Sequence, residues 1–395
     1  MLRSLIALLF LSLALPAQAQ HWSRSWAAAP VEAPADPDRP PPDLTDRTLR
    51  QVVRLSSGGT AIRLRLSNEL SPLPLVIGRV EVAMADSDGR IVPGTSRTVR
   101  FDGETRVVIP MRAPMLSERI GMPVAPLSRI AISIHLPQGA PSPTIHPHGA
   151  ATGWMARGDQ TTASALTDPT PFYHRLIVAG LDVESARPQR TVATFGDSIT
   201  DGVDATRDAD TRWPDFLAQR LQRGGMRNVG VANVGISGNR MLTDGAGPNA
   251  LARFDRDVLS VPGISHVIVL EGVNDIGAAS RDKAADRPGA DDIIDAYRQM
   301  IARARDRGVK LIFATILPYK GAGYWSDYGE GVRAQVNQWI RTNREAAGFV
   351  DLDRAIRDPA DPQRMAKAYD QGDALHPNDA GFRAMADAID LKLLR

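Results

Sequence analysis

The stretch Phe195-Gly196-Asp197-Ser198-Ile199-Thr200 follows directly on the run from Thr191 to Thr194. A short run of strand-forming residues that ends in small and polar residues is typical of a buried strand that gives way to a loop. In doubly wound α/β proteins, ligands and reactive groups lie in the loops at the carboxyl ends of the strands. The sequence therefore places Ser198 where such a fold presents a nucleophile.

From Arg190 onward the chain repeats a pattern of buried strand, loop and amphipathic helix. Strands are predicted at Arg190–Phe195, Asn228–Val234, His266–Glu271, Lys310–Ile316 and Gly348–Leu352. Helices are predicted at Trp213–Arg223, Ala290–Arg307, Gly331–Ala347 and about Asp379–Leu394. Five strands that alternate with helices predict a parallel sheet covered on both faces.

The front half of the chain has a different periodicity. Apolar residues alternate with charged or small ones over Ala61–Leu66 and Ile130–Leu136, which is typical of half-buried strands. Glycine-rich turns and prolines separate such runs, and this favours an antiparallel β-sandwich or jelly-roll-like domain. We place this domain at residues 20–188 and the α/β domain at residues 189–395. The proline-rich segment from Ala27 to Leu44 is expected to be extended and to lie on the surface.

The first nineteen residues have the features of a secretory signal peptide. One basic residue, Arg3, precedes an apolar run from Leu5 to Leu15, and Ala17-Gln18-Ala19 is typical of a signal-peptidase site. Eleven apolar residues are too few to span a bilayer, so stable membrane insertion is not expected. The sequence thus predicts a periplasmic or secreted protein.

The composition excludes several classes of function. The net charge is only +2 and basic residues are scattered among acidic ones, so nucleic-acid binding has no electrostatic support. The chain has no cysteine, which excludes thiol catalysis and cysteine metal sites. An exported fold without disulfides must rely on the packing of its core.

A serine hydroxyl becomes a nucleophile only when a base removes its proton, and histidine is the side chain whose pKa suits that role. Among seven histidines, His376 has the most suitable setting, in Asp373-Ala374-Leu375-His376 before the last predicted helix. A loop of this length lets the Asp373 carboxylate bind the imidazole Nδ1 and leaves Nε2 free to face Ser198. The predicted catalytic residues are Ser198, Asp373 and His376.

Acyl transfer also needs donors for a tetrahedral oxyanion. The N–H of Ser198, the N–H of Gly238 and the side-chain amide of Asn274 follow the first three predicted strands and are the predicted donors. Taken one at a time, the stretches around Gly238 and Asn274 are ordinary turn sequences. Their occurrence at successive strand ends, together with Ser198 and His376, favours an active site.

These four blocks resemble those of the SGNH hydrolases, the GDSL esterase and lipase superfamily, whose serine, glycine, asparagine and histidine correspond to Ser198, Gly238, Asn274 and His376. Ile199 stands where the usual motif has leucine. The resemblance covers about residues 190–395. It implies a flavodoxin-like three-layer α/β/α domain, hydrolysis through a serine acyl-enzyme, and no cofactor or metal.

The chain is also similar to a subset of these enzymes that carry an N-terminal β-domain, which includes xylanase-associated esterases. The similar parts are Trp26–Pro30, Leu66–Asn68 and Leu270–Gly277. This resemblance favours a small-molecule or polysaccharide ester as substrate, with acetyl as the acyl group. A lipase, lysophospholipase or thioesterase that acts on longer chains is the alternative, and a non-catalytic carbohydrate-binding envelope protein is a third.

Other polar residues near these motifs have simpler expected roles. Asp197 and Asp275 are expected to orient loops through backbone hydrogen bonds. Four further carboxylates lack the spacing of a calcium loop and are expected to be solvated: Asp201, Asp204, Asp208 and Asp210. The pattern leaves open whether His146, His148 or Arg240 contacts the substrate, and how many subunits assemble.

Overall fold

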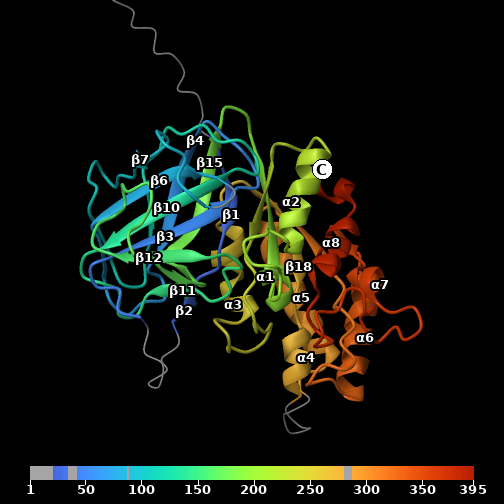
Figure 1. Ribbon diagram of the computed structural model, residues 1–395. Coiled ribbons are helices and arrows are strands. Elements are labelled where there is room, and N and C mark those ends of the chain that lie inside the picture. The colour runs from blue at the N-terminus through green and yellow to red at the C-terminus, as the bar shows by residue number, and fades with distance from the viewer. Residues whose placement is uncertain (1–20, 34–41, 87–88, 280–286) are drawn as a thin grey trace, which may run out of the picture.

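The computed structural model describes residues 21–33, 42–86, 89–279 and 287–395. The predicted signal peptide lies outside these residues, as do residues 34–41 of the proline-rich segment. An antiparallel β-domain formed by the first half of the chain packs beside an α/β domain formed by the second half (Figure 1). Within the described ranges, every helix is too short or too polar to cross a membrane.

Two antiparallel sheets make up most of the β-domain. The first sheet has the order β1 (His21–Ala27), β15 (Val178–Ser185), β4 (Ala61–Ser67) and β9 (Pro114–Leu116). The second has the order β13 (Thr170–Phe172), β12 (Gly153–Arg157), β3 (Arg47–Arg54), β10 (Arg129–Leu136), β6 (Arg79–Ala85) and β7 (Arg97–Thr98). Smaller sheets pair β14 (Arg175–Leu176), β11 (Thr144–His146) and β2 (Val31–Glu32), and β5 (Leu75–Ile77) with β8 (Val107–Ile109).

The core of the β-domain confirms the period-two pattern. Ile62, Leu64 and Leu66 of β4 are fully buried, whereas the arginines between them are half-buried. They pack with alternate residues of β10 in one cluster that draws on both sheets. The β-sandwich prediction is therefore confirmed.

The second half of the chain folds around a five-stranded parallel sheet. Its order is β17 (Val229–Asn233), β16 (Arg190–Gly196), β18 (Ile264–Leu270), β19 (Lys310–Ala314) and β20 (Gly348–Val350). In chain order this is 2-1-3-4-5, the flavodoxin-like arrangement. The longer helices that cover it are α2 (Trp213–Arg223), α5 (Ala290–Asp306), α6 (Asp327–Thr342) and α8 (Asp379–Asp387).

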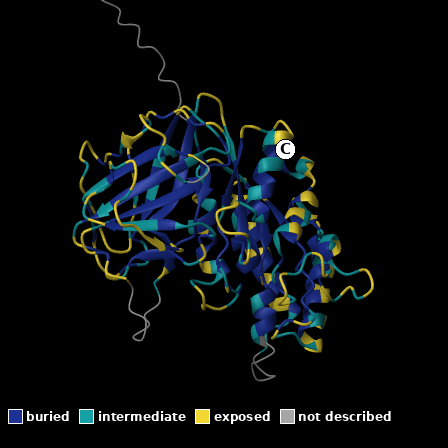
Figure 2. Ribbon diagram, in the orientation of Figure 1, coloured by how far each residue is buried: buried dark blue, intermediate teal, exposed yellow. Residues whose placement is uncertain are grey.

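Helices on the two faces of this sheet form separate groups, which gives the three layers predicted. Helix α2 packs against α8, and α8 also contacts α7 (Leu352–Ile356). Helix α5 packs against α6 and against α3 (Ala250–Phe254). Short helices α1 (Ser198–Asp201) and α4 (Val273–Ala279) follow β16 and β18 directly. The strands between these layers are buried (Figure 2).

Two predicted helices have different bounds in the structure. Helix α6 begins four residues before Gly331 because the Ser326 side chain accepts a hydrogen bond from the Gly329 N–H and caps it there. The last helix ends at Asp387, and Leu391–Leu394 form a separate 3₁₀ turn. The Asp390 side chain accepts the N–H of Lys392, and this local bond starts the new turn.

The prediction of a surface segment from Ala27 is wrong for its first residues. Ala27, Ala29 and Val31 are buried in the core of the α/β domain, whereas Trp26 and Ala28 are buried in the core of the β-domain. The chain is extended there, so successive side chains point to opposite sides. The segment is buried because it lies between two cores, each of which receives alternate side chains.

Strand β17 is at the edge of the parallel sheet, and the β-domain covers it. Ser56, just after β3, accepts a hydrogen bond from the Val231 N–H at its Oγ (2.8 Å), and the same oxygen lies 3.0 Å from the Val231 carbonyl. At Gly230 a Cβ would lie 2.5 Å from the Arg24 carbonyl of β1, so only glycine allows this approach. The contact pairs backbone groups that an open sheet edge would leave exposed.

We expect Ser56→Ala to destabilise the protein, because it leaves the Val231 N–H buried without its partner. The expected loss is about 1–3 kcal/mol in the free energy of unfolding, measured by urea denaturation. Ser57→Ala is the matched control, since the buried Ser57 hydroxyl has no hydrogen-bond partner among the described residues. Equal losses in the two variants would show that the Ser56 bridge contributes nothing.

Candidate active site

The loop after β16 holds Ser198 at the first position of α1. Asp197 caps this helix, since its Oδ1 accepts the Ile199 N–H at 2.9 Å. Gly196 is required just before it, because a Cβ there would lie 2.2 Å from the Leu270 carbonyl of the neighbouring strand. Ser198 is 6% exposed. An N–H at the first helical position has no partner within its own helix, so the Ser198 N–H is available to a ligand.

His376 connects Ser198 with Asp373 through hydrogen bonds. Its Nε2 lies 2.9 Å from Ser198 Oγ, and its Nδ1 lies 2.6 Å from Asp373 Oδ2. The other Asp373 oxygen accepts the backbone N–H of His376 at 2.8 Å. The loop that arranges this has left-handed backbone at Gly372 (φ 123°) and Ala374 (φ 61°). This arrangement lets the hydroxyl lose a proton to a histidine that the carboxylate orients.

The pKa of Asp373 identifies it as the charged partner of His376. Partial burial acts to raise the pKa of this carboxyl, but hydrogen bonds from the backbone and side chain of His376 and from the Leu375 N–H outweigh it. The result is a pKa below the usual aspartate value. The Asp373 carboxylate is therefore ionised at neutral pH.

The predicted oxyanion donors lie after the carboxyl ends of adjacent strands. Gly238 follows β17, is exposed and has left-handed backbone (φ 77°) that favours glycine. Its two neighbours are held on either side: Ser237 Oγ donates to Asp201 Oδ2 of α1 (2.7 Å), and the Asn239 carbonyl accepts from Asn274 Nδ2 of α4 (2.9 Å). The loop carrying Gly238 is thus tied to the helices that carry Ser198 and Asn274.

Asp197 and Asp275 have the loop-orienting contacts that the sequence predicts. Besides the Asp197 cap, the Asp275 carboxylate accepts the N–H groups of Met241 (2.7 Å) and Leu242 (3.0 Å). Burial raises the pKa of Asp197 to about 7 and that of Asp275 to about 6. The buried Asp197 carboxylate thus fixes the turn that carries Ser198, and the buried Asp275 carboxylate fixes the chain that follows Gly238.

Sequence reasoning missed Arg253, which is buried beneath the site in α3. Its guanidinium donates to the carbonyls of Gly196 (2.9 Å) and Val234 (2.7 Å) and to the Asn239 side chain (2.7 Å). It therefore joins the end of β16, the end of β17 and the loop with Gly238. An arginine in a short helix carries no signal of this role, because its partners come from three distant segments.

The four aspartates after Ser198 do not gather around a common point. Asp201 is buried and binds Ser237 and His146, Asp208 accepts from Thr152, and Asp210 pairs with arginines of the β-domain. The expectation of solvated carboxylates is therefore wrong for Asp201, which the domain interface covers, and for Asp210, which is half-buried and pairs with Arg54 and Arg129. Arg240 is half-buried and His148 is exposed.

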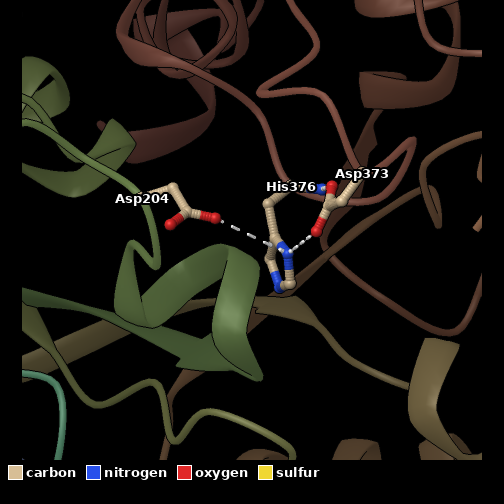
Figure 3. A group of neighbouring side chains, drawn as sticks. All are labelled: Asp204, Asp373 and His376. Atoms are coloured by element: carbon tan, nitrogen blue, oxygen red, sulfur yellow. Dashed lines mark hydrogen bonds and ion pairs between the residues drawn. The ribbon is translucent and has the colours of Figure 1, made fainter.

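Asp204 is a second carboxylate near the histidine, as Figure 3 shows. Its Oδ2 lies 3.9 Å from His376 Nδ1, too far for the hydrogen bond that Asp373 makes to the same nitrogen. Ligand atoms of Asp204, Asp373 and His376 lie within 4.8 Å of one another. Because Nδ1 is already bound to Asp373, a cation there would compete with the hydrogen bond that orients the imidazole.

Comparison with known proteins finds a family that is similar to this part of the chain. Residues 194–384 match the GDSL-like Lipase/Acylhydrolase family. Uncharacterized esterase YxiM of Bacillus subtilis (strain 168) is 28% identical over 125 residues, which cover 29% of this chain and 30% of that protein. The chain therefore spans less than a third of the length of this relative.

Solved structures also match about half of this chain. A GDSL-like lipase of Bacteroides thetaiotaomicron is 19% identical, with 52% of this chain and 88% of that chain covered and a TM-score of 0.38. A variant of Axe2, an acetyl xylan esterase of Geobacillus stearothermophilus, is 22% identical, with coverage of 52% and 94% and a TM-score of 0.42. The family match confirms the resemblance: residues 194–384 are similar to the GDSL-like Lipase/Acylhydrolase family, and this similarity indicates a carboxylic ester hydrolase.

Proposed function

We propose that the protein is a serine esterase in which Ser198, His376 and Asp373 are the catalytic residues. The observation that supports it most directly is the continuous hydrogen-bonded path from Asp373 through His376 to Ser198. Ser198 Oγ attacks the ester carbonyl as its proton passes to His376 Nε2. The alcohol then leaves with that proton, and a water molecule attacks the acyl-enzyme in the same way.

The negative charge that forms on the carbonyl oxygen needs donors around it. We propose that the N–H groups of Ser198 and Gly238 and the side-chain amide of Asn274 supply them. Their positions after three adjacent strands support this role, and each such donor is worth about 3 kcal/mol in the transition state. The Asn274 amide has a second N–H besides the one that it donates to Asn239.

The proposed substrate is a short acyl ester, with acetyl on a polysaccharide as the preferred example. The path from Asp373 to Ser198 has polar surroundings, because Asp373 is exposed and the exposed Asp204 lies 3.9 Å from His376 Nδ1. Such surroundings suit a hydrated sugar better than a long acyl chain, which needs apolar lining. We also propose export to the periplasm or medium, which rests on the signal-like sequence of residues 1–19.

We expect Ser198→Ala to lower kcat on p-nitrophenyl acetate at least ~1,000-fold, because it removes the nucleophile. The purified protein is assayed at neutral pH on acetate, butyrate and octanoate esters. Acetate is expected to give the highest kcat/KM. Preference for octanoate would support a lipase instead, and equal rates for the variant and the parent protein would rule out Ser198 as the nucleophile.

We expect Asp373→Asn to lower kcat by about 100- to 10,000-fold, since the amide can no longer stabilise the imidazolium or fix the tautomer. Asp204→Asn is the matched control. It removes a neighbouring negative charge that makes no hydrogen bond to Nδ1, so its expected effect on kcat is less than about 10-fold. If the two variants lose activity equally, Asp373 is not the residue that orients His376.

A further inference from the structure

His146 of the β-domain contacts the α/β domain next to Ser198. It ends β11, is 5% exposed, and its Nε2 lies 2.9 Å from Asp201 Oδ1 at the end of α1. Its Nδ1 lies 3.1 Å from the carbonyl of Ala29 in the segment between the two cores. One imidazole therefore joins three segments that are distant in the sequence.

Both ring nitrogens of His146 face oxygen atoms that accept hydrogen bonds. A carbonyl oxygen only accepts hydrogen bonds, so the Nδ1 that faces Ala29 carries a proton. A carboxylate also only accepts, so Nε2 is the donor in a hydrogen bond to Asp201. Burial by itself raises the pKa of Asp201, but the His146 charge and the hydrogen bonds from His146 and Ser237 bring it below the usual value. His146 and Asp201 thus form a buried hydrogen-bonded pair across the two domains.

The other oxygen of Asp201 holds the loop that carries Gly238. Asp201 Oδ2 accepts both the backbone N–H (3.0 Å) and the hydroxyl (2.7 Å) of Ser237. The same loop packs tightly on α1, because a Cβ at Gly235 would lie 2.3 Å from the Asp201 nitrogen. A shift of the Asp201 carboxylate would therefore move Ser237 and, with it, the adjacent N–H of Gly238.

We propose that His146 is a positioning residue of the esterase site, through which the β-domain fixes Asp201, Ser237 and hence the oxyanion donor Gly238. This inference rests on the proposed function. His146 does not touch the substrate in this role. It makes the β-domain part of the catalytic apparatus rather than an appended module, because the α/β domain alone lacks the group that binds Asp201 Oδ1.

The test measures ester hydrolysis together with inhibition by phenylboronic acid. The boron of this compound binds Ser198 Oγ while the hydroxyl proton passes to His376, and the resulting tetrahedral anion resembles the transition state. His146→Ala is expected to lower kcat for p-nitrophenyl acetate about 10- to 100-fold with KM changed less than about 3-fold. The inhibition constant is expected to rise in parallel with the loss of kcat/KM.

Two further variants report on the same path. His146→Gln can donate one N–H to Asp201 and is expected to recover part of the lost kcat. Ser237→Ala, at a half-buried position, removes one hydrogen bond to Asp201 and is expected to lower kcat about 5-fold. If His146→Ala does not fold, Ser237→Ala and His146→Gln still decide the question. The effects of His146→Ala and Ser237→Ala should be non-additive, because both act through Asp201.

Gln222→Met is the matched control for a weakened domain interface. Gln222 Nε2 donates to the Ser56 carbonyl of the β-domain (2.9 Å), but it lies in the last turn of α2, before the amino end of β17 and away from the site. Its loss should leave kcat and boronate inhibition unchanged. Equal kinetic losses in Gln222→Met and His146→Ala, or full activity and inhibition in folded His146→Ala, would overturn the proposal.

The outcome for Ser198→Ala separates this inference from the proposed function. If that variant keeps its esterase rate, the proposed function fails. If it loses the rate while His146→Ala, His146→Gln and Ser237→Ala keep theirs, only the positioning role of His146 fails.

Discussion

The edge of the parallel sheet at β17 determines how the two halves of this protein are arranged. An uncovered edge strand exposes unpaired N–H and C=O groups, which is a liability for a folded protein. Here Ser56 binds Val231, and β1 approaches so closely that residue 230 must be glycine. Because β1 is also paired with β15 of the β-domain, the cover and the β-domain are one unit. The docking of the two halves therefore follows from the need to cover this edge, and it brings His146 to the end of α1.

A second constraint acts within the α/β domain, where Arg253 is buried beneath the candidate active site. A buried cation needs partners, and Arg253 has Asp257 at 3.2 Å, Glu271 at 3.8 Å and the face of Phe195 at 4.0 Å. Burial lowers the pKa of Arg253, and burial of Glu271 raises the pKa of that carboxyl well above its usual value. The Arg253 guanidinium donates to the carbonyls of Gly196 and Val234, at the ends of β16 and β17. These hydrogen bonds hold the loops that follow the two strands. The site is rigid where the reaction needs fixed donors.

The sequence was sufficient for the parts of the fold that local patterns determine. The alternation of strands and helices predicted the parallel sheet, and the spacing of Asp373 and His376 predicted a contact that one loop can make. The roles of Arg253 and His146 could not be predicted. Arg253 binds groups from three separate segments. His146 and Asp201 are 55 residues apart and meet only when the domains dock. The wrong prediction for Ala27–Val31 has the same origin, since small residues and proline resemble a surface segment unless a second core lies beside them.

The β-domain also contacts the loop from Gly202 to Arg212, which follows the helix that carries Ser198. Asp204, Asp208 and Asp210 all have left-handed backbone, with φ of 66°, 63° and 52°. Each such residue costs of order 1 kcal/mol, so the loop needs contacts that offset this strain. The β-domain supplies them: Thr152 donates to Asp208 at 2.6 and 2.7 Å, and Arg129 pairs with Asp210.

At its other end the same loop reaches the histidine. Asp379, at the start of α8, accepts from the Thr206 N–H (3.0 Å) and the Thr211 hydroxyl (2.7 Å), and it follows His376 by three residues. The position of Asp204 near His376 is thus set from both domains. The β-domain therefore acts on two sides of the nucleophile helix, on Asp201 through His146 and on Asp204 through this loop. A catalytic domain of the same sequence without its β-domain would keep the order of its strands and the contacts of Ser237 and Asp379, but it would lose those that His146, Thr152 and Arg129 supply.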